Sequence, residues 1–260
     1  MGNSEFIQWL LAAETPSIRY LTMRDLLDLP EDDPQVVAAR RAIMTTGPVP
    51  TILAGQTEGG NWAGESSYYS PKYVSTHWSM LLLAELAADG QDERLQRGAE
   101  YMLEANRSRI ERAVRDGTRS MFPCFCGNVL RYALHCGRAG DPRVGDLVRY
   151  LSQCVQREDW RCQYNGELRC AWGAARAAWG LAALPPAYRT PEVEGVIESA
   201  LNFLLAEHHL TEGDYPTSGS VHSLWSRISF PLFYQADILF VLRVLGDLGR
   251  LDRPGAQVAL

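Results

Sequence analysis

Lysine is almost absent from this chain of 260 residues: Lys72 is the single lysine, and arginine supplies the remaining basic side chains. The formal net charge is -6 and no cluster of basic residues occurs, so nucleic acid is not expected as a partner. No apolar run is long enough for a membrane span. The first residues lack a basic stretch followed by an apolar one, so they do not resemble a secretory signal.

The six cysteines include no pair with Cys-x-x-Cys spacing, which removes the most common signal for a metal or redox site. Without a signal peptide, they indicate a reduced, cytoplasmic chain. Cysteines in such a chain serve as core residues, metal ligands or catalytic groups, and the positions of these six decide between the three roles.

Sustained alternation of apolar and polar residues is also missing, which argues against a sheet-rich fold. A helix start recurs instead, with a capping residue followed by proline and an apolar residue two positions further on. The copies are Asp33-Pro34-Gln35-Val36, Asp141-Pro142-Arg143-Val144 and Thr190-Pro191-Glu192-Val193, with a proline-free version at Asp92-Glu93 and a shifted one at Asp252-Arg253-Pro254. The interval is 49 residues from Asp92 to Asp141 and again from Asp141 to Thr190, which predicts a repeat built of helix pairs.

The two helices of each pair differ in character. The helix after each start is amphipathic, whereas the other is apolar on nearly every face and is therefore expected to be buried on every face. Alternation of the two kinds predicts an inner ring of apolar helices wrapped by an outer ring of amphipathic ones. We expect one all-α domain over residues 1–260, an α/α toroid (barrel) of about five helical hairpins. The inner helices are expected to start near Pro16, Lys72, Pro123, Arg169 and Pro231.

A motif supports this architecture. Residues Gln56 to Trp62 match the Gln-x-x-x-Gly-x-Trp pattern, and Gln156 to Trp160 form a shorter copy without the glycine. In this motif the glutamine is expected to cap backbone groups at a helix end while the tryptophan covers the turn. The chain resembles the terpenoid-cyclase and protein-prenyltransferase superfamily with squalene-cyclase repeats, in a short bacterial-type form. The resemblance implies an α/α toroid with a central cavity for an apolar or isoprenoid-like substrate.

The departures from the family leave the reaction unassigned. The Asp-x-Asp-Asp motif with which class II terpene cyclases protonate their substrate is missing from this sequence. Prenyltransferases hold zinc with an Asp-x-Cys pair, and Cys124-x-Cys126 has cysteine in place of the aspartate. Lanthionine cyclases bind zinc partly through an adjacent Cys-His pair, which His135-Cys136 reverses. A transferase or cyclase-like enzyme therefore remains one expectation among others.

Several cysteines fall where an inner helix begins, and helix N-termini stabilise thiolates. If the inner helices run parallel, these thiolates gather at one rim, where three of them and an imidazole make a tetrahedral zinc site. The expected ligands are Cys124, Cys162, Cys170 and His222, with Cys126 as the substitute for Cys124. The alternative is that all six cysteines are core residues, as we expect in any case for Cys136 and Cys154.

Two further groups of residues are candidates for a site. His77 and Tyr73 lead into the second inner helix as a possible acid or base and pocket wall, with Tyr69 and Trp78 as binding residues.

The second group belongs to the later inner helices. Tyr234 and Asp237 interrupt the fifth apolar run, where a carboxylate has to be paired, hydrated or functional. Arg131 and Arg176 are partners for Asp237 or for an anionic ligand, and the ion pair is the favoured interpretation.

Two functions follow from these candidates. The first is an enzyme whose cavity takes a small apolar molecule or a peptide, with Tyr73, His77, Tyr234 and Asp237 in catalytic roles. The second is a non-catalytic binding or scaffold module with a structural zinc and a filled barrel. An open cavity lined by these residues favours the first, and a centre filled by side chains favours the second.

Overall fold

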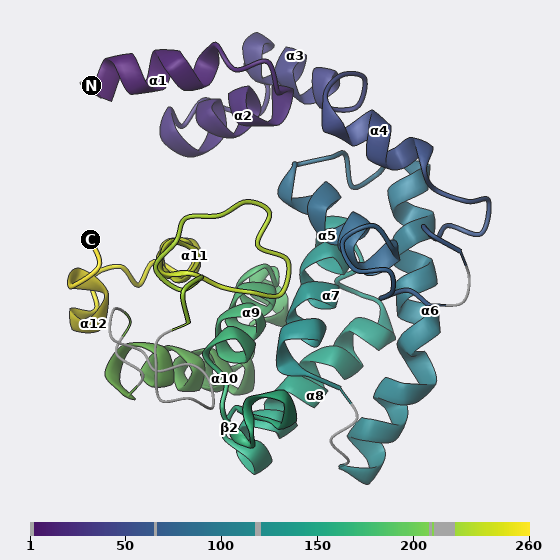
Figure 1. Cartoon of the computed structure of the whole chain (residues 1–260), viewed down its shortest axis with the longest axis vertical. Helices are drawn as coiled ribbons and strands as arrows, with labels where there is room; N and C mark the ends of the chain where they lie inside the picture. The colour runs from purple at the N-terminus through teal and green to yellow at the C-terminus, as the bar shows by residue number, and fades with distance from the viewer. Residues whose placement is uncertain (1–2, 65–66, 118–120, 208–209, 211–221) are drawn as a thin grey trace. The chain divides into compact units, whose positions relative to one another are not determined.

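The computed structural model describes residues 3–64, 67–117, 121–207, 210 and 222–260 (Figure 1). This part of the chain is mostly helical, as predicted for an all-α protein. The contacts divide the chain into two compact units, Met1–Met102 and Leu103–Leu260, and each is described by itself. The single domain and the closed toroid stay predictions. No helix in the described ranges combines the length and hydropathy that crossing a membrane requires.

Unit 1 consists of short helices joined by turns. Its elements are α1 (Asn3–Leu11), α2 (Pro16–Leu21), the π-helical η1 (Thr22–Leu26), α3 (Pro34–Ile43), α4 (Pro48–Ala54), α5 (Thr76–Glu85) and the first part of α6 (Glu93–Asp116). Helix α2 packs against α3, and α4 packs against α5. Met23, Val36 and Ala39 form one buried apolar cluster between α3 and η1.

Unit 2 holds the rest of α6 and the later helix pairs. Its further elements are α7 (Pro123–His135), α8 (Pro142–Glu158), β1 (Arg161–Cys162), η2 (Gln163–Asn165), β2 (Leu168–Arg169), α9 (Ala171–Ala182), η3 (Pro186–Tyr188), α10 (Pro191–Asn202), the π-helical η4 (Phe203–Glu207), α11 (Ile238–Asp247) and α12 (Pro254–Gln257). Strands β1 and β2 form a two-stranded antiparallel hairpin that the sequence did not indicate, with Arg161 opposite Arg169.

The helices of unit 2 form two layers (Figure 1). Helix α9 packs between α7 and α11 in one layer, while α8 and α10 pack against each other and cover α7 and α9. Within this unit, the predicted inner helices are therefore neighbours of one another. The predicted outer helices α8 and α10 form the second layer, which packs against the inner helices.

The predicted helix starts are confirmed by the hydrogen bonds that cap them. The side chains of Asp33, Asp141 and Thr190 each accept a backbone N–H from a residue two or three positions further on. Asp92 accepts the N–H of Arg94 at 2.9 Å in the same way, and α12 begins at Pro254. These starts were predictable because a capping bond depends only on residues within one turn.

The first residues of the inner helices were predicted with more variable success. Helices α2 and α7 begin at the predicted prolines, and α5 and α9 begin within a few residues of the expected positions. The prediction of a fifth helix starting near Pro231 is wrong, because α11 begins only at Ile238, where Asp237 caps it.

The inner helices also differ in how completely they are buried. Every residue of α9 from Ala171 to Leu181 is buried, as expected. The same expectation is wrong for α11, which buries one face while Leu239 on another face is 50% exposed.

The Gln-x-x-x-Gly-x-Trp segment of unit 1 connects two helices. The side-chain amide of Gln56 donates to the carbonyl oxygens of Gly60 at 3.0 Å and of Arg94, in the first turn of α6, at 2.8 Å. The buried indole of Trp62 donates to the carbonyl of Ile52 near the end of α4 at 2.7 Å. These contacts agree with the roles expected of the glutamine and the tryptophan.

The second copy of this motif keeps only its tryptophan. Trp160 is buried and donates to the hydroxyl of Ser199 at 3.1 Å, whereas Gln156 is exposed. The missing glycine and the shorter spacing therefore remove the glutamine from the contact that its counterpart makes in unit 1.

Candidate binding site on the inner helices

The side chain of Trp179 on α9 lies at the centre of a cluster of arginines. Three guanidinium carbons lie near its ring centroid: Arg131 of α7 at 4.8 Å, Arg176 of α9 at 5.1 Å and Arg243 of α11 at 6.0 Å. Each is within the range at which a cation is attracted to the face of an indole ring. One fully buried ring thus joins three basic side chains from the three helices of this layer. We call these four residues the arginine–tryptophan cluster.

Arg176 is buried, with 1% of its surface exposed. Its Nε and Nη2 donate to the backbone carbonyl of Gln235 at 3.0 and 2.6 Å. Its guanidinium also lies 4.0 Å from the ring centroid of Phe240. Arg176 therefore fixes the segment before α11 against α9, which is a structural role that the sequence analysis did not anticipate.

Asp237 is the N-cap of α11 and is 2% exposed. Its Oδ1 accepts the backbone N–H of Phe240 at 2.7 Å. Burial raises the pKa of this carboxyl above its ordinary value, while hydrogen bonds from the backbone and the charge of Arg176 act in the opposite direction. The side chain of Arg176 donates to the carbonyl of Gln235, and its ion pair with Asp237 stays a prediction.

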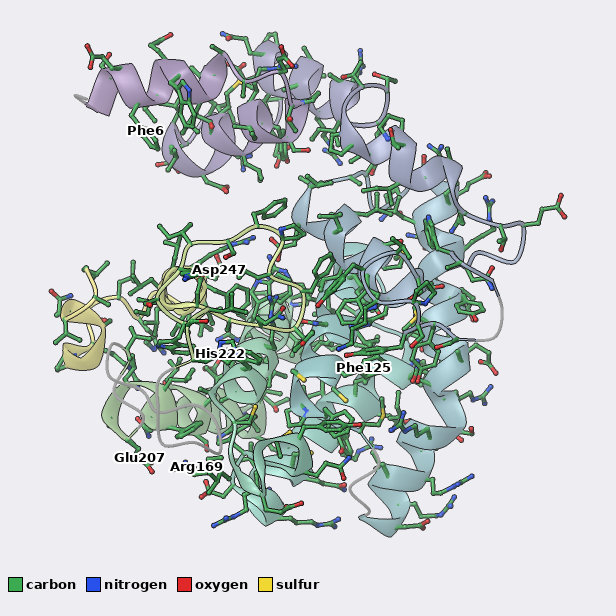
Figure 2. All side chains as sticks on the ribbon, in the orientation of Figure 1. Phe6, Phe125, Arg169, Glu207, His222 and Asp247 are labelled. Atoms are coloured by element: carbon green, nitrogen blue, oxygen red, sulfur yellow. The ribbon has the colours of Figure 1, made fainter. Side chains whose placement is uncertain are left out.

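Arg131 and Arg243 are the two arginines of the cluster that are exposed to solvent at least in part. Nη1 of Arg131 lies 3.9 Å from Oδ2 of Asp247, which lies at the end of α11 (Figure 2). Their side chains are 25% and 36% exposed, respectively, and Arg243 is an exposed residue. The indole Nε1 of Trp179 is buried and has no hydrogen-bond partner among the residues that the structure describes. The cluster therefore combines accessible guanidinium groups with an unsatisfied donor.

Tyr234 and His222 both pack against the edge of Trp172. Their ring centroids lie 5.8 and 5.0 Å from that of the indole, in edge-on arrangements. Nδ1 of His222 accepts the backbone N–H of Leu224 at 3.1 Å. The structure thus brings together Tyr234 and His222, which the sequence had assigned to different sites.

The predicted zinc ligands are only partly assembled. Cys124 and Cys162 lie close enough for a charge on one to raise the pKa of the other, and burial, the larger cause, raises the pKa of Cys124 to about 12. The sulfur of Cys170 accepts the backbone N–H of Gly173 at 3.2 Å and caps α9. The described residues contain no group of three or more His, Cys, Asp or Glu side chains that could hold a metal ion. The zinc site stays a prediction.

The substitute ligand Cys126 is buried near two other thiols, those of Cys154 and Cys124, and its role as a ligand stays a prediction. Burial raises its pKa well above the ordinary value, and Cys154 and Cys124 add to the rise. Cys154 and Cys162 line a small cavity beside the start of α7, with room for about one water molecule. The hydroxyl of Tyr150 bonds to Cys154 and to the backbone of Met121. Cys154 is therefore a core residue, as expected.

The candidate residues of unit 1 form an aromatic cluster of their own. His77 is 1% exposed, and its ring lies 5.7 Å from that of Tyr69 and 4.8 Å from that of Trp78. Tyr73 lies 5.5 Å from Trp78, is 46% exposed, and has a backbone φ of 74°. The structure therefore joins these four predicted residues within unit 1, and their catalytic and binding roles stay predictions.

No family model, no curated protein and no solved structure matches this chain. The resemblance to the terpenoid-cyclase and prenyltransferase superfamily therefore stays a prediction that rests on the sequence motif. Arg131 and Arg176 were identified from the sequence, whereas Trp179, Arg243 and Asp247 were not. Arg243 had a signal, since it interrupts the apolar run of α11. The carbonyl of Gln235 had none, because a backbone acceptor is invisible in a sequence.

Proposed function

We propose that this chain is a non-catalytic helical-repeat module that binds a ligand on the inner helices of unit 2. The observation that carries the proposal is the bond of Arg176 to the backbone carbonyl of Gln235 through two of its nitrogens. A buried arginine used in this way holds two segments of the protein together. It is not available to stabilise charge on a reacting substrate, which requires donors directed at the substrate.

The other candidate catalytic groups support the same conclusion. Asp237 uses one carboxylate oxygen to cap α11, so protonating a substrate would remove a bond that starts the helix. His77 is enclosed by Tyr69 and Trp78, and Tyr234 packs against Trp172. Each of these side chains has a packing partner from its own unit, which is the arrangement expected in a filled interior.

Close packing between the inner helices also favours a module with a filled centre. A methyl group added to Gly127 of α7 would lie 2.1 Å from the carbonyl oxygen of Arg176 on α9. Two helices in such close contact leave no room between them for an isoprenoid-sized molecule. A ligand of unit 2 is therefore expected at the accessible edge of the layer, where Arg131, Arg243 and Asp247 lie. A structural zinc remains part of this proposal as a prediction.

Equilibrium dialysis against the small-molecule fraction of a cell extract tests the proposal, with mass spectrometry of both compartments. We expect at least one compound to be concentrated by the protein with its mass unchanged, and the rest of the mixture to stay as it was. Formation of a product, lost in Asp237→Asn or His77→Gln, would establish an enzyme instead. Failure to concentrate any compound would exclude small-molecule binding by this module.

A further inference from the structure

The small cavity beside the start of α7 is lined by three sulfur-containing residues. Cys154 of α8 and Cys162 of β1 both border it, and Met121 is the third. The cavity has a volume of about 10 Å³, which is room for about one water molecule. Two thiols from different elements therefore border one space that is large enough for a single ion.

We propose that this cavity is a binding site for a soft metal ion, Cu(I), held by the sulfur atoms of Cys154 and Cys162. Thiolate and thioether groups are the ligands that select Cu(I), because soft ligands suit a soft ion. A structural zinc ion instead needs four protein ligands, and the described residues contain no group of even three His, Cys, Asp or Glu side chains that could hold a metal ion. Cu(I) is satisfied by two thiolates, so two cysteines suffice.

The chemistry around the cavity also suits a soft ion. A charge on Cys162 raises the pKa of Cys124, and a charge on Cys154 raises that of Cys126, so two further thiols of α7 lie near those of the cavity. The described residues that line the cavity include no carboxylate and no imidazole. Hard cations such as Mg²⁺ and Ca²⁺ take oxygen ligands, which this lining does not offer from carboxylates.

The lining also provides a route of entry and a compensating charge. Cys162 lies between Arg161 and Gln163, two exposed residues that border the same cavity, so an ion can reach the sulfur by displacing surface side chains. When Cu(I) binds, the two thiols each form a bond to the ion and release a proton, and the complex carries one negative charge. Arg161 brings a positive charge to the lining, which partly offsets it.

Anaerobic titration of the full chain with Cu(I), kept reduced by ascorbate and presented as its coloured bicinchoninate complex, tests the proposal. We expect the protein to withdraw about one Cu(I) per chain from the chelator and to release about two protons per ion. The melting temperature should rise with the amount bound. X-ray absorption at the copper edge should show sulfur atoms as the nearest neighbours, and an equal concentration of Zn(II) should not displace the copper.

Four variants locate the ion. Cys154→Ser and Cys162→Ser should each weaken Cu(I) binding at least about tenfold, because each removes one thiolate ligand. Cys162 lies between exposed residues, so its variant is expected to fold even if Cys154→Ser does not. Cys136→Ser is the matched control, since Cys136 is buried but does not border the cavity. Cys170→Ser should also bind as the wild type does, although Cys170 is one of the predicted zinc ligands.

Three results would overturn the copper site. The first is a chain that withdraws no Cu(I) from the chelator. The second is equal affinity in wild type and Cys162→Ser. The third is binding that is lost in Cys170→Ser but retained in Cys154→Ser, which would assign the metal to the predicted zinc ligands. The ligand proposed for the inner helices is tested separately by dialysis, so either proposal can fail without the other.

Discussion

Gly127 of α7 and Gly180 of α9 meet where the two inner helices of unit 2 come closest together. A methyl group on Gly180 would lie 2.4 Å from the carbonyl oxygen of Gly127, closer than carbon and oxygen atoms can approach. The same contact brings a methyl group on Gly127 within 2.1 Å of the carbonyl of Arg176. Both residues therefore allow the backbones to approach, and the position of Arg176 in the cluster depends on them.

Gly127→Ala is expected to destabilise the chain strongly. The added methyl group meets backbone atoms, which cannot rotate away, so α7 and α9 have to separate. Overpacking of this kind destabilises by about 1–3 kcal/mol or more. Urea unfolding monitored by circular dichroism measures the loss.

The matched control for this prediction is Gly145→Ala in the outer helix α8, where an added methyl group meets no atom of the described residues within 4 Å. Alanine should stabilise this helix by about 0.5–1 kcal/mol, because it loses less conformational entropy on folding than glycine. Equal effects of the two substitutions would contradict the close contact between α7 and α9.

The carboxyl of Asp237 should make stability depend on pH in a defined direction. Burial raises its pKa in the folded chain above the unfolded value of about 3.9. The folded state then binds the proton more tightly, so the free energy of unfolding falls as the pH rises from about 3.9 through the folded pKa. Asp237→Asn removes the charge, and its stability relative to the wild type should increase over that rise.

Comparison of Asp237→Ala with Asp237→Asn separates the effect of the cap from the effect of the charge. Alanine removes the acceptor for the N–H of Phe240, and losing an N-cap destabilises by about 1 kcal/mol. Thermal unfolding of the three proteins between pH 3.5 and roughly pH 7 would measure both effects. A wild-type chain that gains stability relative to the asparagine variant over this range would refute the assignment.

Asp141 should show the opposite dependence on pH. Its bonds with Arg143, together with the backbone N–H of that residue, lower its pKa despite partial burial. Its contribution to stability is therefore complete above the unfolded pKa of about 3.9 and is lost as the pH falls through the folded pKa. In Asp141→Asn the cap acceptor remains but the charge does not, so this variant should lose less stability on acidification than the wild type.

The control for Asp141 is Asp146→Asn on the exposed side of the same helix, where the bond to Arg149 involves a largely exposed arginine. Its effect on acid unfolding should be small, because exposed ion pairs contribute about 1 kcal/mol or less. An identical acid transition for wild type and Asp141→Asn would show that the contact with Arg143 does not contribute to the free energy of unfolding.

The thiols of the folded chain should react slowly with iodoacetamide. Burial raises the pKa of Cys124 and of Cys136 to about 12, so at about pH 8 very little of either is the reactive thiolate. Peptide mass spectrometry after timed labelling should show these two sites protected in the native chain and labelled rapidly in guanidinium chloride. Rapid native labelling of Cys124 would mean that its thiol is accessible or that a nearby cation lowers its pKa.

Prediction from the sequence was best for features that depend on neighbouring residues. The starts of α3, α8 and α10 followed from a capping side chain and a proline, since both act within one helical turn. The start of α11 was missed because the apolar run continues before it, and only the cap at Asp237 marks the boundary. Burial of α11 was overestimated for the same reason, since apolar composition does not reveal whether a neighbour covers each face.

By itself, the sequence determined that this chain is helical, where most helices begin, and that Arg131 and Arg176 are unusual charges in apolar helices. The tertiary structure alone decided that Arg176 bonds to the carbonyl of Gln235 and that Arg131 and Arg243 meet at Trp179. The physical reason is the separation along the chain of the residues that interact. Helix starts depend on bonds within one turn, whereas the arginine–tryptophan cluster depends on how closely α7, α9 and α11 pack, which Gly127 and Gly180 make possible.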